Sequence, residues 1–256
     1  MNTHIVKAIL AAGLIGAAGG CSTMVQGQSP VAASPAPVAP VDPYAAVRPA
    51  TSSVGVVMPA LSDFPHPWDI TTYVLRVTQF GVMPPLNGGV AFVGDSLTDS
   101  MRWNEMFPNI RSRNFGISGD TTVGLKARIN QVVIAKPAKV ILLIGTNDVE
   151  FSRYSVTEIV ANIDDCIATL QKGVPGVKIV VEGLLPRQPQ YDEKVRTVNT
   201  LIKAAAEKRG LPYVDLYSHF VVNGRLDPSL TPDDIHISGQ GYLIWRDLIR
   251  PYIENN

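Results

Sequence analysis

The chain has 256 residues, of which 46% are hydrophobic and 17% are charged. These proportions exclude an intrinsically disordered chain and are typical of a globular protein with a substantial core. The 22 basic and 22 acidic residues give a formal net charge of zero. The composition therefore lacks the excess of basic residues that is typical of nucleic-acid-binding proteins, and we expect no nucleic-acid partner.

The first twenty residues have the pattern of an export signal. Lys7 precedes an apolar run over 8–18, which is too short for a permanent membrane span. The small residues that lead into Cys21 resemble a bacterial lipoprotein signal, in which this cysteine becomes the lipidated first residue of the mature chain. That resemblance implies an exported protein of the bacterial cell envelope, tethered by lipid at the periplasmic face or the outer membrane. Ala18 replaces the leucine usual in such signals, and ordinary cleavage that leaves Cys21 as a plain thiol is the alternative.

Residues 21–63 are predicted to form a linker between the anchor and a single folded domain. Proline, alanine, valine and serine dominate this stretch, and proline recurs from Pro30 to Pro59. Because proline lacks a backbone donor and favours extended conformations, the linker is expected to be disordered and semi-rigid. We expect the folded domain over residues 64–256.

Strand and helix patterns alternate from residue 68 onward. Helical spacing of apolar residues predicts a helix over 68–80, which a Pro-Pro pair at 84–85 separates from an apolar strand over 89–94. Strands that alternate with helices indicate a parallel sheet covered on both faces. The remaining predicted elements, in chain order, are a strand over 110–115, a helix over 121–133, a strand over 139–144, a helix over 155–170, a strand over 177–181, a helix over 191–209, a strand over 212–216 and a helix from 239 or 240 to 253.

Polar residues follow three of these strands and recur before the last helix. Ser96 closes a Gly-Asp-Ser turn after the first strand, Gly119 lies beyond the second, and Asn147 follows the third. Asp233 and His236 occupy the loop before the last helix. Each residue alone has a simpler explanation as a turn residue, a helix cap or a solvated loop residue. Ligands of parallel sheets, however, bind at the carboxyl ends of the strands, where these residues are expected to gather.

Together these residue types meet the requirements of acyl transfer. A serine hydroxyl is a weak nucleophile until a base removes its proton, so Ser96 is the candidate nucleophile and His236 the candidate base. Asp233, three residues earlier, can hold the imidazole ring and stabilise its protonated form. The N–H groups of Ser96 and Gly119 and the side-chain amide of Asn147 are candidate donors to an oxyanion.

Four short blocks carry a family resemblance. They are Gly-Asp-Ser-Leu at 94–97, Gly119 in Ser-Gly-Asp-Thr, Gly-Thr-Asn-Asp at 145–148 and Asp-x-x-His at 233–236. In this order they resemble the motif blocks of the SGNH (GDSL-type) hydrolases, and the similarity runs from about residue 88 to the C-terminus. Residues 181–187 also resemble the platelet-activating-factor acetylhydrolase-like branch.

The resemblance implies the fold and the roles of the site residues. The implied fold is of the α/β class, a three-layer α/β/α sandwich with a five-stranded parallel, flavodoxin-like sheet. Ser96, Asp233 and His236 would form the catalytic triad, and Ser96, Gly119 and Asn147 the oxyanion hole. One departure is Asp234, where the family often has glycine. Its charge would either strengthen the imidazolium or point to solvent.

We expect neither a metal nor a cofactor, because the remaining histidines form no ligand cluster with cysteine or carboxylates. Cys166 lies in the apolar stripe of a predicted helix, which indicates packing and not reactivity. The residues set aside from the site are His4, His66, Trp103, Tyr154, Arg187 and His219.

The sequence thus predicts a serine esterase that hydrolyses carboxylic esters through an acyl-enzyme. The substrate would be a small-molecule, glycan or lipid ester, and short acyl or O-acetyl groups are favoured because no long apolar lid is evident. A lipase, lysophospholipase or thioesterase is the alternative within enzymes. A non-catalytic envelope lipoprotein that binds glycan or a partner protein is the alternative from another class. The oligomeric state is not indicated.

Overall fold

The computed structural model describes residues 56, 58–64, 66–150 and 154–254. All of them belong to one of two compact units, the one that spans Asp42–Asn256. The predicted export signal, Cys21 and the linker up to residue 55 lie outside the described residues. Residues before the predicted domain start also pack on the domain, since Val56 is completely buried in its core.

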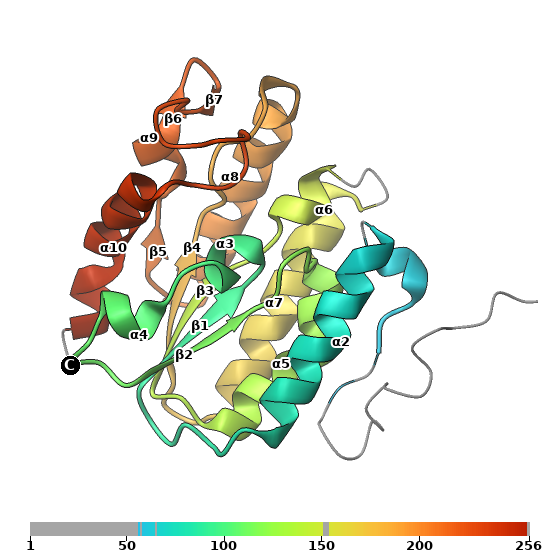
Figure 1. Cartoon of the computed structure of the whole chain (residues 1–256), viewed down its shortest axis with the longest axis vertical. Coiled ribbons are helices and arrows are strands. Elements are labelled where there is room, and N and C mark those ends of the chain that lie inside the picture. The colour runs from blue at the N-terminus through green and yellow to red at the C-terminus, as the bar shows by residue number, and fades with distance from the viewer. Residues whose placement is uncertain (1–55, 57, 65, 151–153, 255–256) are drawn as a thin grey trace, which may run out of the picture. The chain divides into compact units, whose positions relative to one another are not determined.

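Five parallel strands form the central sheet, in the order β2-β1-β3-β4-β5 (Figure 1). In the sheet register, Gly94 lies opposite both Gly116 and Leu143, so β1, β2 and β3 end side by side. The predicted parallel sheet is thereby confirmed. The strands are β1 (Val90–Gly94), β2 (Ser112–Gly116), β3 (Lys139–Leu143), β4 (Lys178–Glu182) and β5 (Tyr213–Val214).

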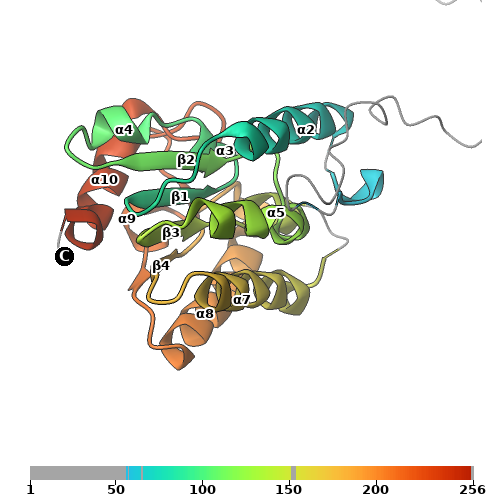
Figure 2. The same cartoon turned by 90° about the horizontal axis from the view of Figure 1, so that it is seen from below.

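Helices cover both faces of the sheet, as predicted for a three-layer sandwich. Figure 2 shows α2, α5 and α7 on one face and α4 and α10 on the other; α8 packs beside α7. The long helices are α2 (Pro67–Val82), α5 (Thr122–Ala135), α7 (Val156–Gly173), α8 (Asp192–Lys208) and α10 (Gly239–Glu254). The short ones are η1 (Leu61–Asp63), α3 (Ser96–Asp99), α4 (Trp103–Met106), α6 (Thr146–Glu150), η2 (Pro189–Tyr191) and α9 (Tyr217–Phe220).

Two segments near the C-terminus differ from the sequence expectation. The fifth strand keeps only two residues of the predicted 212–216, because the Leu216 N–H bonds back to the Val214 carbonyl and the chain turns into α9. An unpredicted antiparallel hairpin follows, made of β6 (Val221–Val222) and β7 (Arg225–Leu226). Its turn is Asn223-Gly224, with φ of 52° and 71°. Such an Asn-Gly pair is a strong hairpin signal in a sequence.

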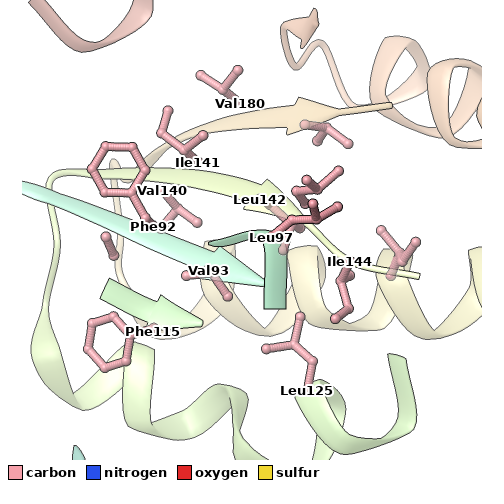
Figure 3. Packing of buried hydrophobic residues seen from close by; sticks show 14 of the residues in the cluster. Phe92, Val93, Leu97, Phe115, Leu125, Val140, Ile141, Leu142, Ile144 and Val180 are labelled. Atoms are coloured by element: carbon pink, nitrogen blue, oxygen red, sulfur yellow. The ribbon is translucent and has the colours of Figure 1, made fainter. Parts of the chain in front are cut away.

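The core lies between the sheet and its helices. Figure 3 shows Phe92 and Val93 of β1 and Ile141 and Leu142 of β3 packed with side chains of neighbouring elements. These side chains are apolar on both faces of the strands, as a doubly covered sheet requires. Cys166 is completely buried, and burial raises the pKa of its thiol to about 12, in keeping with the predicted packing role. Among the described helices, none has the length and apolar content needed to span a membrane.

Glu182 places a carboxyl group in this core, at the end of β4. Its Oε1 accepts a hydrogen bond from Trp245 Nε1 at 2.5 Å. Burial raises the pKa of Glu182 to about 8, more than the Trp245 hydrogen bond lowers it. The folded chain therefore holds a proton that an unfolded glutamate, with a pKa of about 4.3, releases. Stability should then fall as the pH rises from about 4 to about 8.

Glu182→Gln keeps the hydrogen-bond acceptor and removes this titration. We expect urea unfolding of the variant to show a flatter pH dependence than the parent chain between about pH 5 and about pH 8. Glu207→Gln, at an exposed position of α8, is the matched control and should leave the slope unchanged. An unchanged slope in Glu182→Gln would show that the buried carboxyl is ionised throughout.

Candidate active site

The turn after β1 presents Ser96 at the start of α3. Asp95 caps this helix, since its carboxylate accepts the Leu97 N–H at 3.1 Å. The turn is packed tightly, because a Cβ on Gly94 would lie 2.2 Å from the Leu143 carbonyl oxygen. Ser96 itself is only 7% exposed. Glycine at 94 thus lets the chain turn directly against β3, and the serine hydroxyl emerges at the sheet edge.

Three predicted site residues lie in one hydrogen-bonded line. His236 Nε2 lies 3.0 Å from Ser96 Oγ, and His236 Nδ1 lies 2.8 Å from Asp233 Oδ2. A carboxylate only accepts hydrogen bonds, so Nδ1 carries the proton and Nε2 is left to accept from the serine hydroxyl. This arrangement can remove a proton from Ser96 as its oxygen attacks a carbonyl carbon.

Hydrogen bonds within the loop that contains Asp233 and His236 orient the His236 ring. Asp233 Oδ1 accepts the His236 N–H at 2.7 Å and the Ile235 N–H at 3.0 Å. Thr231 Oγ1 donates to the His236 carbonyl at 2.6 Å and accepts the Asp234 N–H at 2.9 Å. Thr231 closes the loop in this way, although its sequence position carried no signal beyond that of a possible turn residue.

Asp233 is held in its charged form. Partial burial raises its pKa, but the hydrogen bonds from the His236 ring and from the backbone N–H groups of His236 and Ile235 outweigh it, so the net pKa is lowered. The side chains of His236 and Asp233 are 41% and 47% exposed. The end of the line formed by His236 and Asp233 is therefore open to solvent, whereas Ser96 at the other end is largely buried.

The predicted oxyanion donors come from the ends of the first three strands. Gly119 has a φ of +77°, and a Cβ there would lie 2.4 Å from Asp69 Oδ1, so only glycine fits. Asn147 Nδ2 donates to the carbonyl of Asp120 at 2.8 Å, which joins the loops after β2 and β3. The second amide hydrogen of Asn147 meets no acceptor among the described residues. It is available, with the Ser96 N–H of the first turn of α3, to a ligand.

Two cations hold the short helix that carries Asn147. Arg187 is 1% exposed; its Nη1 donates to the Thr146 carbonyl at 2.5 Å and its Nη2 pairs with Glu150 at 2.6 Å. Lys194 Nζ donates to the Val149 carbonyl at 2.9 Å. The sequence leaves Arg187 outside the site, whereas the structure gives it a supporting role behind Asn147. Its main-chain partners are not visible in sequence spacing.

Buried carboxyl groups lie beneath the turn. Burial raises the pKa of Asp95 to about 7 and that of Asp120 to about 6, although Arg128 pulls the second value down. Arg128 and Asp120 form a fully buried ion pair at 2.8 Å, and Arg128 Nη2 also donates to the Gly94 carbonyl at 3.0 Å. These groups brace the backbone from which Ser96 projects.

The remaining described residues of interest contact other parts of the chain. Trp103 is buried against Phe92, with ring centroids 4.2 Å apart, and Tyr154 bonds to Asp63 at 3.0 Å. His219 is exposed on α9. Asp234 neither points freely to solvent nor bonds to His236, because it pairs with Arg225. Within the described part of the chain, no group of three or more histidine, cysteine or acidic side chains could hold a metal ion.

Known proteins resemble this chain in sequence and in fold. A model of the GDSL-like lipase/acylhydrolase family matches residues 92–244. Platelet-activating factor acetylhydrolase IB subunit alpha2 from Homo sapiens is 31% identical over 164 residues, which cover 60% of this chain and 70% of the relative.

Solved structures agree with the fold. A GDSL-like lipase from Bacteroides thetaiotaomicron is 27% identical, with a TM-score of 0.61 over 71% of this chain and 97% of that one. An acetylxylan esterase from Geobacillus stearothermophilus is 22% identical, with a TM-score of 0.57 over 66% of this chain and 95% of that one, a likeness of fold alone. Since the family model spans more than half of the sequence, the chain belongs to the GDSL-like lipase/acylhydrolase family and is an ester hydrolase.

Proposed function

We propose that the chain hydrolyses short-chain acyl or O-acetyl esters through an acyl-enzyme on Ser96, with His236 as base and Asp233 as its orienting carboxylate. One observation carries the proposal: His236 lies 3.0 Å from Ser96 Oγ and 2.8 Å from Asp233 Oδ2 at once. Family membership supplies the reaction class, ester hydrolysis, and these distances support the assignment of roles to individual residues.

In the first half-reaction, Ser96 Oγ attacks the ester carbonyl carbon while its proton passes to His236 Nε2. The carbonyl oxygen becomes an oxyanion and accepts hydrogen bonds from the N–H groups of Ser96 and Gly119 and from the Asn147 amide. Asp233 stays ionised and stabilises the imidazolium. When the tetrahedral intermediate collapses, His236 returns the proton to the leaving alcohol, and the acyl group stays on Ser96.

In the second half-reaction, water replaces the alcohol. His236 removes a proton from this water, whose oxygen attacks the acyl carbon and forms a second oxyanion. Collapse breaks the bond between the acyl carbon and Ser96 Oγ, and His236 gives the proton back to the serine oxygen. The acid is released and the site is restored without a net change in charge or proton count on the three residues.

Two observations support a short acyl chain on a bulky alcohol. The human relative is named an acetylhydrolase and is 31% identical over 164 residues. The side chains of His236 and Asp233 are 41% and 47% exposed, so the side of the site where the leaving alcohol takes its proton is open. An alcohol as large as a sugar or a glycerol backbone can approach such an edge.

Ser96→Ala removes the attacking oxygen and leaves the binding groups in place. We expect turnover of p-nitrophenyl acetate to fall by about 10⁴-fold or more. A fluorophosphonate probe should label the parent chain and not the variant, since only an activated serine reacts. Ser218→Ala, exposed on α9, serves as the control and should keep full activity and labelling. Unchanged hydrolysis by Ser96→Ala would refute the assignment, and an unlabelled parent chain would favour a binding protein.

Asn147→Ala removes the side-chain donor to the oxyanion. We expect kcat to fall about 10²–10³-fold with a small change in KM, because the hydrogen bond strengthens only as negative charge develops. Asn104→Ala, at an exposed position of α4, is the matched control. A comparable rise in KM with kcat preserved would instead assign Asn147 to ground-state binding.

Acyl preference can be measured with p-nitrophenyl esters from acetate to palmitate, together with acetylated oligosaccharides and a thioester. We expect kcat/KM to be highest for acetate and to fall with each lengthening of the chain. A maximum at octanoate or longer would instead identify a lipase or lysophospholipase, and a preference for the thioester would identify a thioesterase.

A further inference from the structure

The loop that carries His236 contains a residue in an unusual conformation. Asp234 has a φ of +63°, in the left-handed region that favours glycine. It lies between Asp233 and His236, so its backbone sets the direction in which the imidazole leaves the loop. Within the loop, Thr231 Oγ1 holds the Asp234 N–H at 2.9 Å, and a side-chain interaction can add to this support.

Arg225 adds a side-chain interaction from outside the loop. Its Nη2 lies 2.6 Å from Asp234 Oδ1 and 2.5 Å from Asp234 Oδ2. The two side chains are 39% and 23% exposed, so the pair is partly shielded from water. The Arg225 Nε is buried and meets no acceptor among the described residues, which leaves Asp234 as the one carboxylate bound to this guanidinium.

The hairpin β6–β7 fixes Arg225 in turn. Leu226, the next residue, is completely buried, and its N–H donates to the Arg187 carbonyl at 3.3 Å. The Arg187 guanidinium bonds the Thr146 carbonyl, next to Asn147. Through Leu226, the hairpin is therefore bonded to Arg187, which supports the segment that carries Asn147. Through Arg225, it is bonded to the loop that carries His236.

We propose that Arg225 is a positioning residue, which holds the left-handed turn at Asp234 and thereby keeps the His236 imidazole aimed at Ser96. This role rests on the proposed function of those two residues. An exposed ion pair with a merely structural role contributes little to stability and would not change the rate of the chemical step. A positioning pair would change it, because a displacement of about 1 Å can cost about 10²-fold in rate.

The experiment compares Arg225→Ala, Asp234→Gly and the double variant in the full chain with p-nitrophenyl acetate. We expect Arg225→Ala to lower kcat about tenfold or more, to leave KM within about twofold, and to slow fluorophosphonate labelling of Ser96 in parallel. Asp234→Gly should retain the parent rate, since glycine adopts the turn without support. The double variant should recover most of the rate lost in Arg225→Ala.

Two further variants complete the comparison. Arg225→Lys should give an intermediate kcat, because an ammonium group lacks the planar fork of guanidinium. Arg246→Ala breaks an exposed ion pair with Asp247 on α10, at 2.8 Å, and should leave kcat unchanged. Melting temperatures are measured for all variants to exclude global unfolding.

The outcomes separate the two proposals. A kcat within twofold of the parent in Arg225→Ala, or no recovery in the double variant, would overturn the positioning role and leave the proposed function intact. Ester hydrolysis that survives Ser96→Ala would overturn both the positioning role and the proposed function.

Discussion

The hydrogen bond between His236 Nε2 and Ser96 Oγ joins residues that are 140 positions apart in the chain. It exists only if the end of β1 and the loop before α10 meet at one edge of the sheet. The parallel register brings the end of β1 to this edge, since Gly94 lies beside Gly116 and Leu143. The position of the histidine loop depends on its internal hydrogen bonds and on the ion pair between Arg225 and Asp234. The reactive geometry is thus a property of the whole sheet edge.

Polar groups buried under that edge keep it in one arrangement. Asp95 caps the helix that begins at Ser96, and Asp120 pairs with Arg128, which also bonds the Gly94 carbonyl. Burial raises the pKa of Asp95 to about 7, so this carboxyl is partly neutral near physiological pH. An unpaired buried charge is costly, so a displacement that separates Arg128 from Asp120 would be unfavourable. The strand ends are therefore coupled by electrostatics as well as by backbone bonds.

Much of the fold could be predicted from local patterns. Apolar spacing predicted the long helices within a few residues of their ends, and the alternation of strand and helix patterns predicted the four longer strands. The fifth strand was predicted too long, because its end is set by a turn into α9 that follows the packing of Leu216. The hairpin at Arg225 was not predicted, although its Asn-Gly turn was visible. Its two strands have two residues each, too few to show a period.

The sequence by itself determined which residues are available for chemistry: a serine, a histidine and an aspartate in motif blocks, with Gly119 and Asn147 after neighbouring strands. It could do so because each block is a local signal, written in adjacent residues. Only the tertiary structure decided what holds those residues in place. Arg187 and Arg225 act through a main-chain carbonyl and carboxylates contributed by other turns of the chain. Such partners are chosen by distance in space, for which sequence spacing has no signal.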